Sequence, residues 1–337
     1  MAPEQPASRQ VAAASHEDWR RIAGASSGRA TITEDGIKIE PIYPRATNAA
    51  PLALRGAWKI IERVTASDGD GAIRQAAEAI AGGAQGIELV FDGSAHPFAS
   101  RLPIAAAKRL AQAVGALPTR DLTILLDAGD STPEIAATFA ETFSGRASLA
   151  LAFDPVAAFA VRAQRFDAIR LRESSGTRDV AAALRSAIRI RDALPLAIAD
   201  GRFWHAAGAS EVVELAVVLA TLAVFLRAPD APPLSSLGVA LAADTSLFAT
   251  IAKFRAARLL LARLAEVIGS DASKVAIHAE TAWRSLARIE PEVNVLRATV
   301  AAVGAIAGGA QSLTVLNCIR ILASLVIHPP PVSADSC

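Results

Sequence analysis

The stretch IELVFDGSAHPFASRLPIAAAKRLAQAVGALPTRDLTILLD, residues 87–127, contains two short apolar runs on either side of an alanine-rich segment. The runs at 87–92 and 122–127 have the length and composition of strands buried on both faces, and the segment at 104–114 has the length of a helix. Buried strands that alternate with helices are typical of a parallel sheet whose faces are covered by those helices. This stretch therefore predicts an α/β fold.

The same alternation extends from about residue 57 to the end of the last apolar run. Strands are expected at residues 58–64, 87–92, 122–127, 149–154, 196–200, 237–241, 275–279 and 313–316. Helices are expected between them, at residues 71–81, 104–114, 133–143, 180–194, 211–226, 247–268 and 293–307. Eight strands over about 260 residues predict a (β/α)8 barrel. A doubly wound open sheet is the alternative, and residues 166–173 and 183–190 could hold one further strand.

Residues 1–56 differ from the rest in being rich in proline, serine and charged side chains, and we interpret them as an N-terminal arm. A short helix is expected at 17–22. The turn sequence Glu34-Asp35-Gly36 between two β-branched runs predicts a hairpin. An arm of this length cannot bury much of its own surface, so we expect it to lie on the barrel domain or on a partner.

The barrel domain is expected to cover residues 57–316, and residues 317–337 form an atypical tail. The tail is apolar up to Pro329–Pro331, where a helix would have to stop because proline lacks the backbone N–H and clashes with the preceding turn. It is either a helix that closes the barrel or the product of a truncated reading frame.

Composition excludes several classes of protein. The chain of 337 residues has 34 Lys and Arg against 33 Asp and Glu, so it lacks the basic excess of a nucleic-acid-binding protein. The longest apolar run, 215–226, is shorter than the roughly 20 residues of a membrane span. Two cysteines, Cys318 and Cys337, cannot form a disulfide framework or a zinc site. A reduced, cytoplasmic location is the expectation.

Several predicted strands end in an acid, namely Asp92, Asp127, Asp154 and Asp200. In a barrel these ends face the active site. The simpler interpretation is that each aspartate closes a turn or caps the next helix. The paired glycines after two helices, at 82–83 and 308–309, are expected to be helix C-caps because glycine adopts positive φ without strain.

Three further side chains are candidates for a site. His205 follows a predicted strand and could act as a general acid, or it could be a buried histidine beside Trp204. His278 and Glu280 lie two residues apart on one strand and therefore on the same face. They could form a polar cluster, or an ion pair inside the barrel mouth. No phosphate loop, dinucleotide fingerprint, zinc signature or nucleophile elbow is present.

Segments along the chain resemble the small subunit of methylmalonyl-CoA mutase, in the order in which that family has them. The segments are DGIKIEPIY (35–43), DGRFWHAAGASEVVELA (200–216), FATIAKFRAARLL (248–260), HAET (278–281), LRATVAA (296–302) and GGAQSL (308–313). The resemblance implies a barrel whose central channel admits an acyl-CoA. It also implies a separate flavodoxin-like domain that binds adenosylcobalamin, and a heterodimer in which the small subunit is a degenerate partner of the catalytic one.

The chain departs from the catalytic pattern of that family. No D-x-H-x-x-G motif for cobalt ligation occurs, and Phe203 stands where the family has its catalytic His. Residues 54–58 lack the substrate-facing Tyr, nothing after Asp154 matches the family's T-Y-I-F-P-P segment, and Glu280 replaces a Gln. A phenyl ring at the barrel mouth cannot donate a hydrogen bond to a substrate carbonyl.

These departures predict a chain that by itself binds no cofactor and no metal and is inactive. Isomerase activity would then belong to the complex, with adenosylcobalamin in a partner subunit and with this chain in a heterodimer or a homodimer. One alternative is a catalytic acyl-CoA isomerase barrel that works with a separate cobalamin-binding subunit and uses His205 as its donor. Another is an assembly module without affinity for CoA.

Overall fold

The computed structural model describes residues 15–23, 30–41, 43, 57–96, 100–117, 121–143, 147–164, 182, 184–187, 190, 195–228 and 230–316. The chain divides into two units, residues 1–52 and 53–337. The predicted tail, residues 317–337, and the possible extra strand at 166–173 lie outside the described residues.

The first unit contains one helix and one hairpin. Helix α1 (His16–Ala23) begins after Ser15, whose Oγ accepts a hydrogen bond from the N–H of Asp18 at 3.0 Å. Strands β1 (Thr31–Ile32) and β2 (Lys38–Ile39) pair antiparallel, and Gly36 has φ of 77° in the turn between them. The predicted helix and hairpin of the arm are therefore confirmed.

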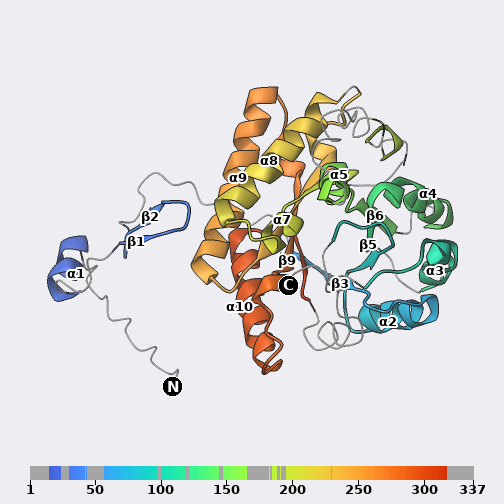
Figure 1. The fold of residues 1–337 in the computed structure, drawn as a ribbon, viewed down its shortest axis with the longest axis horizontal. Coiled ribbons are helices and arrows are strands. Elements are labelled where there is room, and N and C mark those ends of the chain that lie inside the picture. Colours follow the sequence, from blue (N-terminus) through green and yellow to red (C-terminus); the bar gives the residue numbers. More distant parts are fainter. Residues whose placement is uncertain are drawn as a thin grey trace, which may run out of the picture. The chain divides into compact units, whose positions relative to one another are not determined.

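The second unit is a parallel eight-stranded barrel (Figure 1). Its strands are β3 (Lys59–Arg63), β4 (Gly86–Val90), β5 (Leu122–Asp127), β6 (Ala147–Leu151), β7 (Ala197–Asp200), β8 (Leu237–Ala243), β9 (Ala276–Thr281) and β10 (Ser312–Thr314). They are ordered β6-β5-β4-β3-β10-β9-β8-β7. The N–H of Leu151 donates to the carbonyl of Pro195 at 2.9 Å, and that of Ile198 to Phe153 at 3.1 Å, so β6 and β7 close the ring. The prediction of a (β/α)8 barrel is confirmed, and the open doubly wound sheet is wrong.

Helices follow the strands along the chain. They are α2 (Gly69–Ala81), α3 (Ala107–Gly115), α4 (Thr132–Phe143), α5 (Pro155–Gln164), α7 (Arg202–Ala206), α8 (Glu211–Arg227), α9 (Leu247–Ile268) and α10 (Val293–Gly308). Short 3-10 turns occur at Ile104–Ala106, Gly129–Ser131, Leu234–Ser236, Ala272–Lys274 and Trp283–Ser285. Of the predicted helix at 180–194 the structure describes only a part, and residues 184–187 are helical there, which contradicts an extra strand at 183–190.

The two-residue period of the strands separates an apolar outer face from a mixed inner face. On β5, Leu122, Ile124 and Leu126 belong to the main core beneath the helices. The intervening Leu125 points into the barrel, where it packs with Ile61 and other small or branched side chains. A charged residue that pairs in register with Leu125 on a neighbouring strand must therefore also point into the barrel.

Glycine allows the close approach of α9 and α10. A Cβ at Gly308 would lie 2.5 Å from the Cβ of Phe254, so only glycine fits there. The predicted glycine caps are also confirmed, because Gly83 and Gly309 have φ of 97° and 102° at the ends of α2 and α10.

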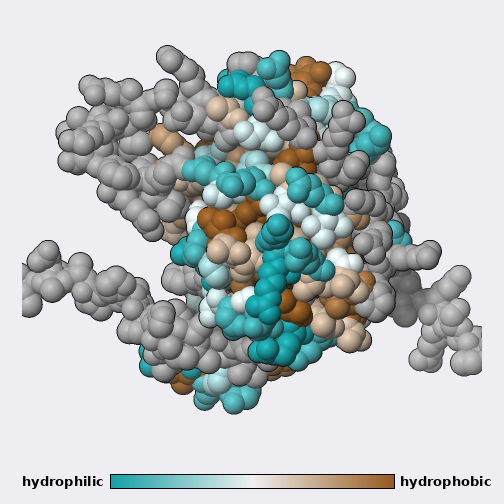
Figure 2. All heavy atoms as spheres, turned by 90° about the vertical axis from the view of Figure 1, so that its right-hand side faces the viewer, coloured by the Kyte–Doolittle hydropathy of each residue, from teal (hydrophilic) through white to brown (hydrophobic). Residues whose placement is uncertain are grey.

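Figure 2 views the side of the barrel that carries α2, α3 and α4, where hydrophilic and hydrophobic patches alternate. An exposed ion pair joins α3 to α2 on the outside of the barrel, with Arg109 Nη2 2.5 Å from Asp70 Oδ1. Within the described part of the chain, no helix, α8 included, has both the length and the apolarity needed to span a membrane.

Candidate functional site at the barrel mouth

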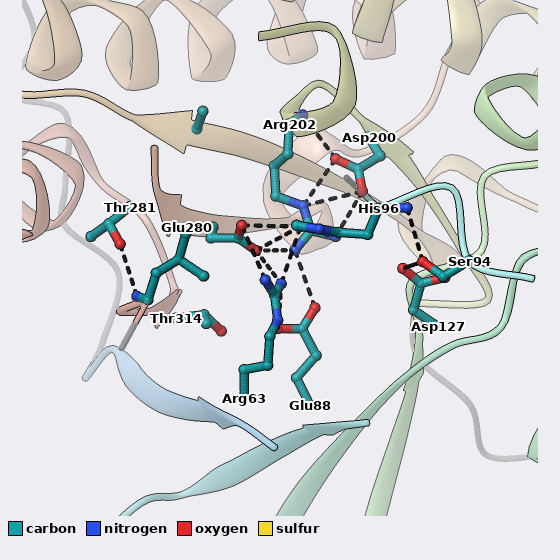
Figure 3. Close-up of polar contacts among 12 residues, drawn as sticks. Arg63, Glu88, Ser94, His96, Asp127, Asp200, Arg202, Glu280, Thr281 and Thr314 are labelled. Atoms are coloured by element: carbon teal, nitrogen blue, oxygen red, sulfur yellow. Dashed lines mark hydrogen bonds and ion pairs between the residues drawn. The ribbon is translucent and has the colours of Figure 1, made fainter. Parts of the chain in front are cut away.

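Four charged side chains meet inside the barrel at the carboxyl ends of its strands (Figure 3). Arg63 ends β3, Glu88 lies on β4, Glu280 lies on β9, and Arg202 is the first residue of α7, directly after β7. We call these four residues the mouth network. Glu88 points inward because its neighbours Ile87 and Leu89 belong to the outer core.

Arg63 joins the two glutamates of the network. Its Nε donates to Glu88 Oε2 at 2.9 Å, and its Nη1 donates to Glu280 Oε1 at 3.4 Å. Its Nη2 lies 2.8 Å from Glu88 Oε2 and also contacts Glu280 Oε2. Arg63 therefore links β4 to β9 through one planar group, an arrangement for which the guanidinium geometry is suited.

Arg202 approaches the same glutamates from the opposite part of the barrel. Its Nη1 donates to Glu280 Oε2 at 2.6 Å and to Glu88 Oε1 at 3.2 Å. Its Nη2 donates to Asp200 Oδ2 at 2.7 Å, and its Nε donates to the same carboxylate. Each guanidinium is thus shared between carboxylates, and each glutamate of the network contacts both arginines.

An imidazole from the loop after β4 completes this layer. His96 Nε2 lies 3.0 and 3.2 Å from the two oxygens of Glu280 and 3.2 Å from Arg63 Nη2. The N–H of His96 donates to Ser94 Oγ at 2.9 Å, and Ser94 Oγ donates to Asp127 Oδ2 at 2.7 Å. Asp127, at the end of β5, is therefore connected to Glu280 through the loop.

Burial makes the pairing in this layer strong. The side chains of the mouth network are at most 5% exposed, so water does not screen their charges. Burial by itself would raise the pKa of Glu88, but the guanidinium groups of Arg63 and Arg202 outweigh it and lower the pKa to about 2. The same opposition, to which the contact with His96 adds, holds the pKa of Glu280 well below its usual range.

His278 lies deeper in the barrel, two residues before Glu280 on β9. Its Nδ1 is 2.9 Å from Ser312 Oγ, and its Nε2 is buried with no hydrogen-bond partner in the described part of the chain. Burial and then the charge of Arg202 lower the pKa of His278 to about 4, so its imidazole is neutral at physiological pH. The structure thus places His278 and Glu280 on one inner face.

Atoms of Glu88, His278 and Glu280 lie within 4.8 Å of one another, a spacing compatible with a metal ion. However, both carboxylates already contact the guanidinium groups of Arg63 and Arg202. A cation at this point would have to displace two fixed positive charges. The geometry therefore gives no reason to assign a metal.

His205 lies in a second buried cluster, beneath α7, α8 and α9. Its Nε2 is 3.4 Å from Asp244 Oδ2, and this contact with His205 lowers the pKa of Asp244. Lys253 Nζ donates to Glu214 Oε2 at 2.6 Å and also contacts Glu211. The ammonium group of Lys253 provides the positive charge between these acids. No hydrogen bond joins His205 to the mouth network among the described residues.

Phe203 does not belong to the mouth network. It is half-buried, and its ring meets that of Trp204 edge to face with centroids 5.2 Å apart. The preceding residue, Arg202, sends its side chain into the barrel instead. The guanidinium group of Arg202, and not the ring of Phe203, contacts Glu280.

The acids at the strand ends have different roles. Asp92 is exposed in a turn. Asp154 accepts hydrogen bonds from the N–H groups of Val156 and Ala157 and so caps α5, and its other oxygen accepts the N–H of Asp200 at 2.9 Å. Burial raises the pKa of Asp154 to about 7. The interpretation as turn or cap is confirmed for Asp154, and also for Asp127 and Asp200, which accept the N–H groups of Gly129 and Arg202 at 3.3 and 2.9 Å. Asp127 and Asp200 contact residues of the mouth as well.

Sequence reasoning missed Arg63, Glu88, His96 and Arg202. Two of them carried a detectable signal, because Arg63 and Glu88 are charged residues inside predicted buried strands. Such residues have to be paired. His96 and Arg202 lie between the predicted elements, where no periodicity indicates the direction of a side chain.

The arginines of the mouth network are already occupied by carboxylates of the same chain. A substrate anion would have to compete with Glu88, Asp200 and Glu280 for these guanidinium groups. The described part of the mouth is thus organised as a self-satisfied ionic layer.

Comparison with known proteins finds similarities in the second half of the barrel. Residues 177–321 match the family described as Methylmalonyl-CoA mutase. A probable methylmalonyl-CoA mutase small subunit of Mycobacterium tuberculosis (strain ATCC 25618 / H37Rv) is 40% identical over 123 residues, which are 34% of this chain and 20% of that protein. The small subunits of Propionibacterium freudenreichii subsp. shermanii (38% over 125 residues) and Streptomyces virginiae (44% over 132 residues) cover 35% and 37% of this chain. Each match spans 20% of the relative's own length.

Among solved structures, a dihydropteroate synthase of Xanthomonas albilineans in complex with indole-2-carboxylic acid and 6-chloroguanine has a TM-score of 0.42 at 14% identity, covering 81% of this chain and 92% of that chain. The enzyme of Thermus thermophilus in complex with 6HMPPP has a TM-score of 0.36 at 15% identity, covering 81% and 94%. The barrel itself is established by the strand order and by the hydrogen bonds that close it.

Proposed function

We propose that this chain, whose residues 177–321 match the methylmalonyl-CoA mutase family, is a non-catalytic partner subunit of an adenosylcobalamin-dependent acyl-CoA mutase. The relatives that it resembles are named small subunits of methylmalonyl-CoA mutase, and a small subunit has a larger partner. In this proposal isomerase activity belongs to the complex, and the chain contributes its barrel as a binding and structural unit in the cytoplasm.

One observation carries the non-catalytic part of the proposal, namely the mouth network. Arg63 and Arg202 are buried cations of the mouth, and each contacts two or more carboxylates. A catalytic mouth needs donors that are directed at the reacting atoms. Here the donors are used up by acids of the same chain, which supports a structural role.

The described residues do not fit a corrinoid cofactor. An imidazole that ligates cobalt must be presented to the cofactor, whereas His96, His205 and His278 are at most 4% exposed. Each of them faces acids or a hydroxyl group of this chain. We therefore place the adenosylcobalamin in a partner subunit and derive no step through it here.

The test is co-expression of the full chain with the large subunit of a methylmalonyl-CoA mutase, followed by size-exclusion chromatography with mass determination. We expect a stoichiometric complex that binds cobalamin and isomerises methylmalonyl-CoA, while the isolated chain does neither. Stoichiometric cobalamin binding or turnover by the isolated chain would contradict the proposal.

His205→Ala is the matched variant, because His205 is the donor of the alternative in which this barrel is itself catalytic. Since His205 lies against Asp244 and outside the mouth network, we expect the complex of this variant to keep its activity. Loss of turnover with an intact complex would favour the catalytic alternative. A titration of the isolated chain with methylmalonyl-CoA distinguishes a CoA-binding subunit from an assembly module.

A further inference from the structure

The outer face of α10 is apolar although it is exposed. Leu296, Val300 and Val303 lie on it, and Leu296 is 67% exposed. Arg297 is the single charged residue of this helix, and its Nη1 donates to Asn294 Oδ1 at 3.0 Å. By contrast, α3 exposes long polar side chains, namely Lys108, Arg109 and Gln112. A barrel helix that faces water is expected to look like α3, so the exposed apolar side chains of α10 mark an interaction surface.

The spacing of these side chains is that of a seam between two helices. Leu296, Val300 and Val303 are separated by four and then three residues, and Val293 and Ala307 continue this spacing at the two ends. Apolar residues at alternating spacings of four and three form the contact line when two helices pack side by side. The occupant that fits this face is therefore another helix with an apolar face of similar length.

The start of α9 lies beside the middle of α10 and extends the apolar surface (Figure 1). A Cβ at Gly304 would lie 3.0 Å from Thr250 Cγ2 and 3.5 Å from Leu247 Cδ1, so the two helices touch there. The next residue of α9, Phe248, is 82% exposed and carries the largest apolar group of this surface. We define the α10 face as Phe248, Leu296, Val300 and Val303.

Opposite charges stand at the two ends of the α10 face. Glu292 precedes α10 and is exposed, and Glu290 and Arg288 lie in the loop before it, so this end is negative. The guanidinium group of Arg255 lies at the other end, with Nη2 3.4 Å from the carbonyl oxygen of Ala307. Neither Glu292 nor Arg255 forms an ion pair within the described part of the chain. The helix between Glu292 and Ala307 is about 22 Å long.

We propose that the α10 face pairs two copies of this chain, with the two α10 helices antiparallel about a two-fold axis at Val300. This axis brings Leu296 of one copy to Val303 of the other, and Glu292 of each copy to the other copy's Arg255. A two-fold interface has to be self-complementary, and charges of opposite sign at the two ends meet this requirement. A parallel arrangement would instead set like charges side by side. The inference goes beyond the proposed function, because it concerns the chain by itself.

The test is sedimentation velocity of the isolated full chain over a wide range of concentrations. We expect a concentration-dependent species of twice the 34.9 kDa mass of the chain. Leu296→Glu and Val303→Glu would each bury a carboxylate in the seam, so the dissociation constant should rise about a hundredfold in either variant.

Val267→Glu is the matched control, because Val267 is also an exposed apolar residue, at 69%, but lies outside the seam. Phe254 packs against Gly308 at the end of α10, and Val267 lies about 20 Å further along α9. This variant should dimerise like the wild type, and circular dichroism should show that all the variants are folded.

A charge reversal tests the orientation of the two copies. Glu292→Arg would face the other copy's Arg255, so attraction becomes repulsion in both symmetric contacts and the dissociation constant should rise about tenfold. The added substitution Arg255→Glu restores opposite charges and should bring the dissociation constant back towards the wild-type value.

Three outcomes would overturn the pairing. One is a double variant that shows no recovery, and another is a dimer that Leu296→Glu leaves intact. The third is a wild-type chain that stays monomeric at every concentration, since the face would then belong to another occupant, such as the arm or the large subunit. Failure of the mutase complex to form would leave these measurements on the isolated chain unaffected.

Discussion

Removal of Arg202 tests whether the mouth network stabilises the barrel. Arg202→Met keeps much of the side-chain volume but leaves Asp200 without its guanidinium partner. Glu88 and Glu280 would then share Arg63 as their remaining arginine, with His96 beside Glu280. All these carboxylates except Asp200, whose side chain is 13% exposed, are almost completely buried, so water cannot replace the lost cation.

Removing one partner from a buried ion pair typically costs about 3 to 5 kcal/mol, because the remaining charge is left uncompensated. We expect a loss of this size in the free energy of unfolding of Arg202→Met near pH 7, measured by urea denaturation followed by circular dichroism. The depressed pKa of Glu88, about 2, stabilises the folded state above its ordinary pKa of 4.5, and this contribution disappears as the pH falls. Because the variant has lost part of that contribution, the difference from wild type should shrink on acidification.

Arg109→Met is the matched control, since Arg109 pairs with Asp70 on the surface with 66% of its side chain exposed. Exposed pairs contribute about 0 to 1 kcal/mol, so this variant should unfold close to wild type. The double variant Arg202→Met with Glu280→Gln should lose less than the sum of its single variants, because the two residues contact each other. Equal stability of Arg202→Met and Arg109→Met at neutral pH would refute the reasoning.

Two other predictions concern groups outside the network. Lys253→Met leaves Glu214 buried without its cation, and the free energy of unfolding from urea denaturation should fall by about 3 to 5 kcal/mol. The added substitution Glu214→Gln should recover part of this loss, because glutamine keeps the acceptor for the Ala242 N–H but carries no charge. If the effects of the two substitutions simply added, the double variant would contradict this expectation. Burial raises the pKa of Asp154 from an ordinary 3.8 to about 7, so the folded state binds this proton more tightly. The free energy of unfolding should therefore fall by about 3 kcal/mol between pH 4 and pH 7. Asp154→Asn should lack that slope, and an unchanged slope would show that another group is responsible.

Local sequence was sufficient for the elements of the barrel. The strand at 122–127 is buried on both faces, so nearly all of its successive side chains have to be apolar. In the sequence this appears as a continuous apolar run of strand length. The glycine caps after α2 and α10 could also be predicted from the sequence, because a positive φ at one position strongly favours glycine there. The hairpin of the arm depends on Gly36 for the same reason.

The site could be predicted only in part. The shared inner face of His278 and Glu280 follows from the two-residue period of a strand, and both residues do point into the barrel. Their partners do not follow from any local pattern, since Arg63 and Glu280 are 217 positions apart. No local signal in the sequence pointed to Arg202, whose side chain the short helix α7 turns into the mouth.

The succession of strands and helices, and the side of each strand that faces the core, can be read from the chain alone, because burial acts on neighbouring residues and leaves a periodic trace. Which charges meet depends instead on how the barrel closes. Closure of the ring brings Arg63, Glu88, Arg202 and Glu280 to one end of the barrel, and the loop after β4 adds His96. Their low exposure follows from that closure, and it is burial among opposite charges that fixes the protonation of the two glutamates and makes the contacts strong.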